Sequence, residues 1–215
     1  MCTVASTSSS SGMVQWGRYK ATSSNITPNV LNRMVYSFPK NPNPHIKLVD
    51  LRYLTIVHYD FEGNLQEGEL VVNAKLAFDV MQIFRGLFKE KFPIQQMSLI
   101  DTFGAPGMAL SELDKRSMAA NNTSAFCYRT ITGDPTRVSN HGLGCAVDIN
   151  PVQNPYVKGN DVFPLEGRSY LNRDPEIPGV ITEEGIVYSA FKELGWEWGG
   201  DWKGLQDYQH FEKKI

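Results

Sequence analysis

The segment SNHGLGCAVDINP, residues 139–151, places a histidine and an aspartate where they could do chemistry. His141 stands among small residues, and Asp148 interrupts an apolar run. Because alternate side chains of a strand face opposite ways, the apolar neighbours of Asp148 would face the core and Asp148 the other side. A carboxylate in such a place needs a cation, several hydrogen-bond donors or a metal ion as its partner.

Two interpretations of this pair are open. Either Asp148 accepts hydrogen bonds from a loop while His141 is exposed, or both residues bind a metal ion. The C-terminal DYQHFE adds His210, with Asp207 three residues before it, although a D-x-x-H pair alone is more often a surface coincidence. Catalytic zinc sites use three protein ligands and leave a fourth position for water, and the two histidines with Asp148 supply such a set. Asp207 could then act as general base toward that water.

Together, SNHGLGCAVDINP and DYQHFE resemble the zinc peptidases of bacterial cell-wall peptides. This family includes D-alanyl-D-alanine carboxypeptidases and L-alanyl-D-glutamate endopeptidases. Its pattern is S-x-H-x-x-G-x-A-x-D, followed by an acidic residue three positions before a final histidine. Every fixed position is present, and the resemblance covers roughly residues 95–215. The matching residues are Ser139, His141, Gly144, Ala146, Asp148, Asp207 and His210.

The resemblance implies a zinc ion held by His141, Asp148 and His210. It also implies that Asp207 is the catalytic acidic residue, and aspartate there is more typical of the endopeptidase branch than of the dipeptidase branch. If residues 207–212 formed one strand, Asp207 and His210 would face opposite sides. We therefore expect a turn near Tyr208 that brings Asp207 to the same centre.

Five further residues are predicted to act on the substrate or are weighed against that role. The resemblance implies that Arg129 holds a substrate carboxylate or polarises the scissile carbonyl; Arg137 lies closer to the motif and is interpreted as a solvated loop charge. Ser139, Asn154 and Tyr156 are predicted to bind substrate, and Tyr156 could donate a hydrogen bond to an oxyanion. A loop fixed by its prolines explains the positions after the metal strand equally well.

Some neighbouring residues receive structural interpretations. Cys145 is predicted to be a buried thiol, with pairing to Cys127 as the alternative. His58 is interpreted as a strand histidine rather than a fourth ligand. At least two of the three tryptophans between residues 196 and 202 are expected to form an aromatic turn rather than a substrate groove.

The composition fits a globular domain. Of 215 residues, 41% are hydrophobic, which is enough for a core. A formal net charge of −2 gives no basic surplus for nucleic acid, and no apolar stretch approaches the roughly 20 residues that span a bilayer. We expect a monomer that binds no nucleic acid.

The N-terminal part differs in composition. Residues 1–27 are predicted to be a flexible Ser/Thr-rich tail or lipoprotein linker, ahead of a zinc peptidase domain at 28–215. Cys2 resembles the mature end of a bacterial lipoprotein, and an arbitrary N-terminus is the alternative. We expect a protein of the cell envelope, in the periplasm or on the outer surface, with Cys2 as its lipid anchor.

The predicted elements alternate without a βαβ rhythm, which favours an α+β fold with a small central antiparallel sheet and helices packed on one side. The resemblance implies the hedgehog/D-Ala-D-Ala peptidase-like version of that fold. Residues 151–180 are predicted to be a long functional loop. Strands are expected at 47–61, 94–103, 145–150 and 207–214, and helices at 71–93, 111–122 and 182–195.

The function expected from the resemblance is hydrolysis of a peptide bond in the peptidoglycan stem peptide, as a D-Ala-D-Ala carboxypeptidase or an L-Ala-D-Glu endopeptidase. One alternative is a catalytically silent zinc-containing module that binds peptidoglycan or a protein. The presence of Asp207 argues against that alternative, because a binding module needs no general base. An amidase that cuts the sugar–peptide link is a second alternative.

Overall fold

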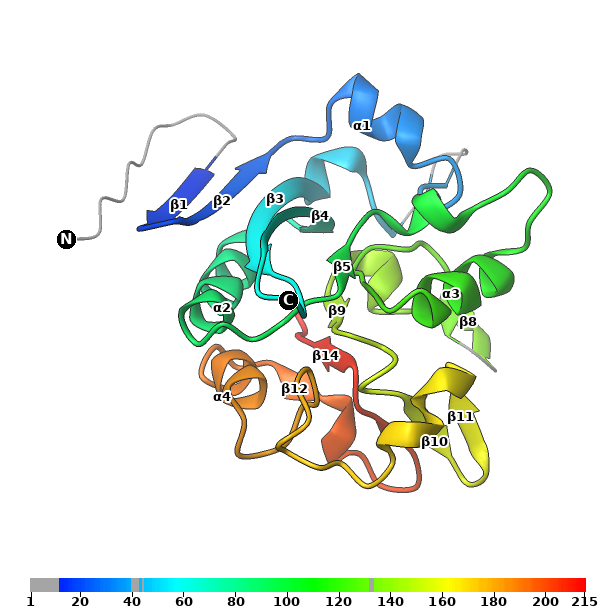
Figure 1. Cartoon of the computed structure of the whole chain (residues 1–215). Coiled ribbons are helices and arrows are strands. Elements are labelled where there is room, and N and C mark those ends of the chain that lie inside the picture. Colours follow the sequence, from blue (N-terminus) through cyan, green and yellow to red (C-terminus); the bar gives the residue numbers. More distant parts are fainter. Residues whose placement is uncertain (1–11, 40–42, 44, 132–133) are drawn as a thin grey trace.

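The computed structural model describes residues 12–39, 43, 45–131 and 134–215, which form an α+β fold (Figure 1). The α-helices of these ranges are α1 (Pro28–Arg33), α2 (Ala77–Lys89), α3 (Leu110–Ala119) and α4 (Ile186–Lys192). The strands are β1 (Gly12–Trp16), β2 (Tyr19–Ser24), β3 (Leu51–Tyr59), β4 (Leu65–Asn73), β5 (Gln96–Met97), β6 (Asn122–Thr123), β7 (Thr130–Ile131), β8 (Asp134–Val138), β9 (Ala146–Asp148), β10 (Tyr156–Lys158), β11 (Asp161–Phe163), β12 (Glu197–Trp198), β13 (Gln206–Asp207) and β14 (His210–Glu212). Short 3-10 helices are η1 (Leu48–Asp50), η2 (Ile100–Phe103), η3 (His141–Leu143), η4 (Leu165–Tyr170) and η5 (Gly199–Asp201).

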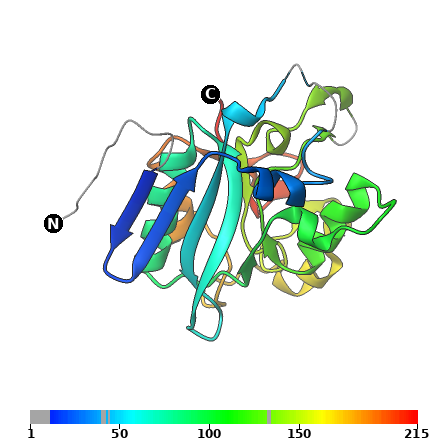
Figure 2. The same cartoon turned by 90° about the horizontal axis from the view of Figure 1, so that it is seen from above.

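The largest sheet is antiparallel, with strand order β1-β2-β3-β4. Helix α2 packs against this sheet and α4 packs against α2, as Figure 2 shows from above. The buried face of α2 carries Val80, Phe84 and Leu87 at helical spacing. The helix predicted over 71–93 is therefore correct in its centre. Its first residues, Val71–Asn73, instead end β4, where β-branched side chains pair with β3.

The predicted flexible tail through residue 27 is wrong for the part that the structure describes. Residues 12–24 form the β1–β2 hairpin at the edge of the large sheet. In β2 every second side chain is buried, beginning with Tyr19, whose hydroxyl donates a hydrogen bond to the Met81 carbonyl at 2.6 Å. Small polar residues hide this alternation in the sequence. Cys2, the expected lipid anchor, lies outside the described residues.

Two three-stranded antiparallel sheets follow in the C-terminal half, in place of the single central sheet that we expected. We call β12-β14-β9 the C-terminal sheet and β11-β10-β13 the hairpin sheet. The chain passes from β13 to β14 through a turn at residues 208–209. The turn predicted near Tyr208 is thus confirmed. It joins the two sheets directly beside the candidate site.

Other elements differ from the predictions in their bounds. The strand expected at 94–103 is only two residues long, because η2 follows it. Residues 151–180, expected as an irregular loop, contain the β10–β11 hairpin and η4. Helix α4 begins after Gly185 rather than at Thr182. None of the described helices combines the length and apolar character needed to cross a bilayer.

Candidate metal centre and active site

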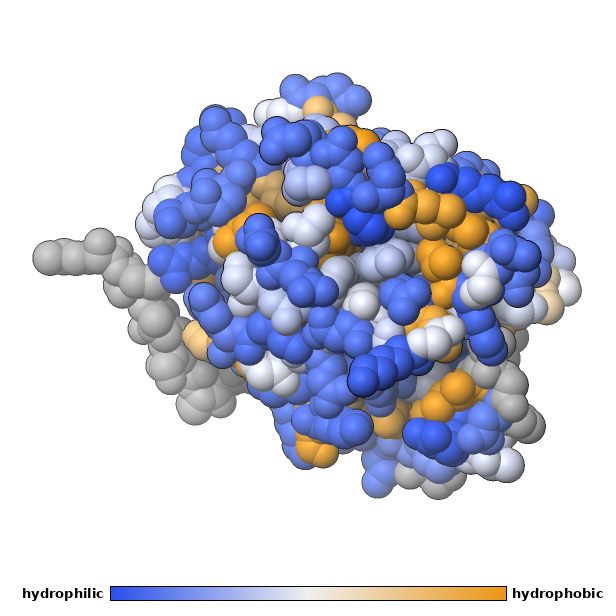
Figure 3. Space-filling view, turned by 90° about the horizontal axis from the view of Figure 1, so that it is seen from below, coloured by the Kyte–Doolittle hydropathy of each residue, from blue (hydrophilic) through white to orange (hydrophobic). Residues whose placement is uncertain are grey.

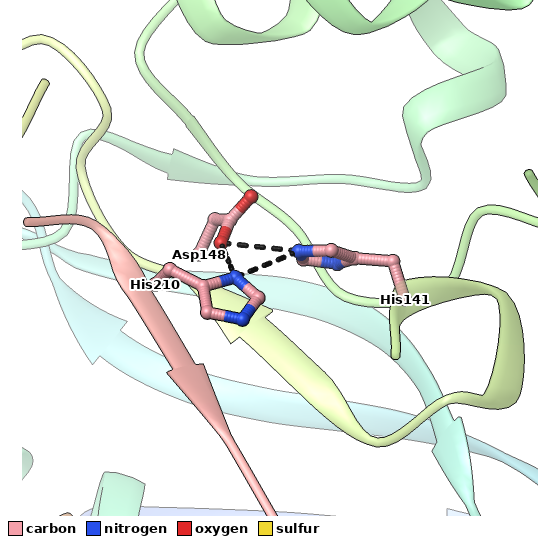
Figure 4. Close-up of side chains that lie close together, drawn as sticks. All are labelled: His141, Asp148 and His210. Carbon is pink, nitrogen blue, oxygen red and sulfur yellow. Dashed lines mark hydrogen bonds and ion pairs between the residues drawn. The ribbon is translucent and has the colours of Figure 1, made fainter. Parts of the chain in front are cut away.

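His141, Asp148 and His210, which we call the triad, converge from three elements of the C-terminal half. Asp148 on β9 and His210 on β14 are direct cross-strand partners, so their side chains share one face. His141 opens η3, just before β9. His210 Nδ1 lies 3.0 Å from Asp148 Oδ1, and His141 Nε2 lies 3.2 Å from that oxygen and 3.1 Å from His210 Nδ1 (Figure 4). The three atoms form a nearly equilateral triangle.

This triangle fits a tetrahedral metal ion. With ligand distances of about 2.0–2.1 Å, two zinc ligands are about 3.3–3.4 Å apart, close to the separations in the triad. All three residues are buried, with 5–8% of their surface exposed. Among the described residues no other three histidine, cysteine or acidic side chains converge in this way. Two imidazoles and one carboxylate are a donor set that zinc commonly takes.

The ring of His141 is oriented by the backbone. Its Nδ1 lies 2.6 Å from the carbonyl oxygen of Ala125. Because a carbonyl only accepts, Nδ1 must carry the proton and Nε2 is left with a lone pair facing the centre. The segment that supplies this carbonyl is fixed to β9, since Ser124 and Asp148 exchange two backbone hydrogen bonds of 2.8 and 3.0 Å.

The ring of His210 is oriented by a carboxylate. Its Nε2 lies 2.9 Å from Oε2 of Glu212, two residues later on β14. Outer partners of this kind fix the tautomer of a metal-binding histidine and raise its basicity. We did not predict this role for Glu212. The signal was present, because residues two apart on a strand project from the same face.

The electrostatics of the triad favour a positive charge. Burial disfavours a charged imidazole, but hydrogen bonds to Asp148 and Glu212 outweigh it and raise the pKa of His210 to about 10. Burial also opposes ionisation of Asp148, but His141 and His210 hold its pKa well below its usual range. Side chains that bind a proton this strongly are also arranged to bind a cation.

The small residues of the motif permit this packing. Gly144 has a left-handed backbone, with φ of 68°, and a Cβ atom there would lie 2.6 Å from the backbone nitrogen of Asn73. Ser139 is 7% exposed, and its Oγ accepts a hydrogen bond from the backbone N–H of His141 at 3.2 Å. Ser139 therefore holds the loop of His141, and its role in binding substrate stays a prediction.

Asp207 lies beside the triad but outside it. Its Oδ1 accepts a hydrogen bond of 3.2 Å from Nε2 of Gln209. Burial raises the pKa of Asp207 to about 6; the charge of His210 opposes this rise and that of Asp148 adds to it. A side chain at Gly199 would collide with Asp207, since its Cβ would lie 2.5 Å from the Asp207 carbonyl oxygen. The glycine therefore lets β13 approach.

Arg129 is near the same centre. Its Nη2 lies 3.2 Å from Oδ2 of Asp114 on α3, and its Nε is buried without a partner among the described residues. Burial disfavours the charged guanidinium, but Asp114 and other neighbours, with Asp148 and Asp207 among them, raise its pKa overall. Arg137 is exposed, as its interpretation as a solvated loop charge requires.

Asn154 does not have the position expected of a substrate-binding residue. Its exposed fraction is 0%. Its amide donates to the carbonyls of Ile149, Asn150 and Gly179, and its Oδ1 accepts from Arg173 and the backbone of Ile181. These bonds tie the 151–181 segment together. The prediction is corrected: Asn154 supports the fold, because buried loops satisfy their backbone groups with such side chains.

The remaining interpretations agree with the structure. Cys127 and Cys145 are buried free thiols, so the alternative of a disulfide is wrong. His58 is buried on β3 and lies outside the triad. Trp196 and Trp198 are core residues, as expected for two of the three tryptophans. The third, Trp202, stands next to the site, with its ring centroid 5.3 Å from that of His210.

A surface groove of about 1080 Å³ lies elsewhere, and no residue of the triad lines it. Its lining includes Arg173, Val180, Gln206 and Tyr208. Gln206 precedes Asp207 on β13, so the two side chains point to opposite faces. Gln206 therefore lines this groove from the face of β13 opposite to that of Asp207.

Residues 132–213 match the family model described as D-alanyl-D-alanine carboxypeptidase. This part of the chain is similar to that family. The match contains the triad and Asp207 and leaves Arg129 and the large N-terminal sheet outside it. The resemblance derived from the motif is thus confirmed for the peptidase segment. No solved structure matches the chain, and the hedgehog/D-Ala-D-Ala peptidase-like topology stays a prediction.

Proposed function

We propose that this protein is a zinc-dependent peptidase that hydrolyses a peptide bond in the stem peptide of peptidoglycan. The observation that carries the proposal is the triad, whose three ligand atoms lie 3.0–3.2 Å apart, with Asp207 beside it. The family match over residues 132–213 supports a peptidase and a substrate derived from the cell wall.

The triad would hold the metal ion. The geometry leaves Nε2 of His141, Oδ1 of Asp148 and Nδ1 of His210 facing one another, while Ala125 and Glu212 bind the other nitrogens of the two rings. When bound there, zinc lowers the pKa of a water toward about 7 and polarises the scissile carbonyl.

Asp207 is proposed as the general base. A carboxylate that is close to the triad, yet outside it, can accept the proton of the attacking water and pass it to the leaving amine. Gln209 holds one of its oxygens by a hydrogen bond of 3.2 Å, which restricts the carboxylate to one orientation. A pKa raised to about 6 makes the group basic enough to accept a proton near neutral pH.

Arg129 and Tyr156 are proposed to bind the substrate. Arg129 is a positive charge near the two aspartates of the site; its Nη2 pairs with Asp114, and its Nε has no hydrogen-bond partner among the described residues. The guanidinium can therefore bind a substrate carboxylate or a developing oxyanion. Tyr156 is half-buried and is the direct strand partner of Asp207, so its hydroxyl can donate to the same substrate.

The cellular setting follows from the substrate. A peptidase of stem peptides would act in the cell envelope, in the periplasm or on the outer surface, as a monomer. Cys2 is proposed as a lipid anchor. A native precursor with a signal sequence ending at Cys2, and fractionation with membranes, would support that anchor; recovery in the soluble fraction after expression of the native gene would contradict it.

Digestion of a purified muropeptide panel tests the proposed function. The zinc-loaded protein is incubated with muropeptides of defined stem length, and the products are weighed by mass spectrometry. Loss of a terminal D-alanine would identify a carboxypeptidase, and release of a peptide that starts at D-glutamate would identify an endopeptidase. Release of the intact stem from the sugar would identify an amidase. No product from the whole panel would favour a binding module over an enzyme.

A further inference from the structure

A row of three side chains crosses the hairpin sheet from β13 to its edge strand β11. Asp207 pairs with Tyr156, and Tyr156 pairs in turn with Phe163. Residues directly opposite each other on antiparallel strands project from the same face. The face that carries the proposed general base therefore also carries two aromatic rings.

This face is turned toward the metal centre. Asp207 is close enough to the triad for all three triad charges to act on it. Tyr156 is close enough to Asp207 for the negative charge of Asp207 to help raise the pKa of the tyrosine, in addition to the effect of burial. The ring centroid of Tyr156 lies 6.4 Å from that of Phe163. The two rings thus continue the surface of the site along the sheet, away from the metal.

The aromatic row ends in an exposed apolar region. Phe163 is 38% exposed, whereas Val162, on the other face of β11, is 4% exposed. Figure 3 shows apolar patches at the right of its view, the side on which Figure 1 places α3, β8, β10 and β11. The exposed apolar side chains of this part of the chain are Phe163, Leu165 and Leu171. An exposed aromatic ring that continues a polar site is suited to a ligand of matching shape.

Charged residues flank the rings on the same face. Lys158 and Asp161 are strand partners at the end of the hairpin, two residues beyond Tyr156 and two before Phe163. Both are exposed. Lys158 supplies a hydrogen-bond donor and Asp161 an acceptor beside the uncharged aromatic rings. A sugar ring, with apolar C–H faces and a polar rim of hydroxyl and acetamido groups, has the complementary chemistry.

The spacing along the sheet favours cleavage close to the sugar over cleavage at the far end of the stem. Adjacent strands are about 4.8 Å apart, so Phe163 stands about 10 Å from Asp207. One extended residue covers about 3.3–3.6 Å. A sugar joined through a lactyl group to the first stem residue lies about two such lengths from the first peptide bond. It lies about five lengths, or about 17 Å, from the bond between the fourth and fifth stem residues, which exceeds the row.

We infer that Tyr156 and Phe163 form a subsite for the sugar to which the stem peptide is attached, and that the bond cleaved is the peptide bond nearest that sugar. This inference rests on the proposed function, and it names the substrate as a glycan-linked stem rather than a free peptide. It adds Phe163, which the sequence motif does not include, to the residues that determine specificity.

Two substrates that differ only in the sugar test the subsite. The zinc-loaded protein is given N-acetylmuramoyl-pentapeptide and the same pentapeptide without sugar, and kcat/KM is measured for each. The ratio of the two values should favour the sugar-bearing substrate, with cleavage after L-alanine. Phe163→Ala should lower this ratio about fivefold to tenfold, as expected for the loss of one aromatic contact. Phe163→Trp should keep it, and Phe78→Ala, an exposed phenylalanine on α2, is the matched control.

The outcomes separate the subsite from the proposed function. An unchanged ratio in Phe163→Ala, or cleavage only at the terminal D-alanine, would overturn the subsite while leaving the peptidase intact. If the parent cleaves neither substrate, the proposed function fails, and calorimetric binding of the same two compounds decides about the subsite. Binding of the sugar-bearing compound that is weaker in Phe163→Ala than in Phe78→Ala would support it; equal binding by both variants would overturn it.

Discussion

Asp148 and Asp207 are carboxylates in two adjoining sheets, and their surroundings give them opposite proton affinities. In the C-terminal sheet, His141 and His210 hold the pKa of Asp148 well below its usual range. In the hairpin sheet, burial raises the pKa of Asp207 to about 6. A carboxylate that stays ionised suits a cation ligand, and one that titrates near neutrality suits proton transfer. Under the proposed function, the C-terminal sheet would supply metal ligands, and the hairpin sheet would supply the general base and substrate contacts.

The largest effect should come from removing a ligand of the triad. His141→Ala leaves two ligands, so we expect loss of zinc and hydrolysis at the background level. His45→Ala, an exposed histidine far along the chain, is the control and should retain both. Elemental analysis and the muropeptide assay measure the outcome. Full zinc content in His141→Ala would mean that the metal is held elsewhere.

Replacing the proposed general base, Asp207, should reduce hydrolysis less than loss of a metal ligand does, but the reduction should still be large. General base catalysis contributes about 10²–10⁴-fold, so Asp207→Asn should lower hydrolysis at least about 10²-fold. Thermal stability should stay near that of the parent, because the amide keeps the size of the side chain and can still bond to Gln209. If the variant hydrolyses substrate as fast as the parent, Asp207 is not the general base. The assignment of proton transfer to the hairpin sheet would then be wrong.

Replacing Glu212 should have a smaller effect, limited to the affinity of the site for the metal ion. Loss of the outer partner of a metal-binding histidine typically weakens metal affinity about 10–100-fold. We expect this for Glu212→Ala, with partial recovery in Glu212→Gln, whose carbonyl can still accept from Nε2 of His210. The exposed Glu67 supplies the control, Glu67→Gln. Competition with a chromophoric chelator gives the affinities, and equal values for all variants would show that Glu212 does not position His210.

The pH dependence of metal uptake should show the smallest change per step, a factor of about ten for each pH unit. The pKa of His210 is raised to about 10, so below that pH a proton must leave before a cation binds. The apparent affinity should therefore rise with pH through the neutral range, about tenfold per unit. For an ordinary histidine of pKa about 6.5, the rise would level off above about pH 7.5. A plateau at that pH in chelator competition would contradict the raised pKa.

How much the sequence predicted depends on whether a feature is local. The triad and the turn before His210 follow from alternation along short strands and from the family motif, and the structure brings these residues together. The β1–β2 hairpin was missed, because only packing against the large sheet shows which of its small polar residues face inward. Asn154 was misassigned, since a polar residue in a loop gives no local sign that the loop will bury it. The carbonyl of Ala125 acts through a tertiary contact that leaves no pattern in the sequence, whereas Glu212 lies two residues from His210 on the same strand and does leave one.

Zinc content of two matched variants tests the central claim most directly. Asp148→Asn and Asp207→Asn each replace one site carboxylate by an amide of equal size, one in each sheet. Measured by elemental analysis after dialysis against equal free zinc, Asp207→Asn should retain close to one zinc per chain, and Asp148→Asn should have lost most of it. Equal zinc content in the two variants, whether high or low, would contradict the assignment of metal binding to the C-terminal sheet and of proton transfer to the hairpin sheet.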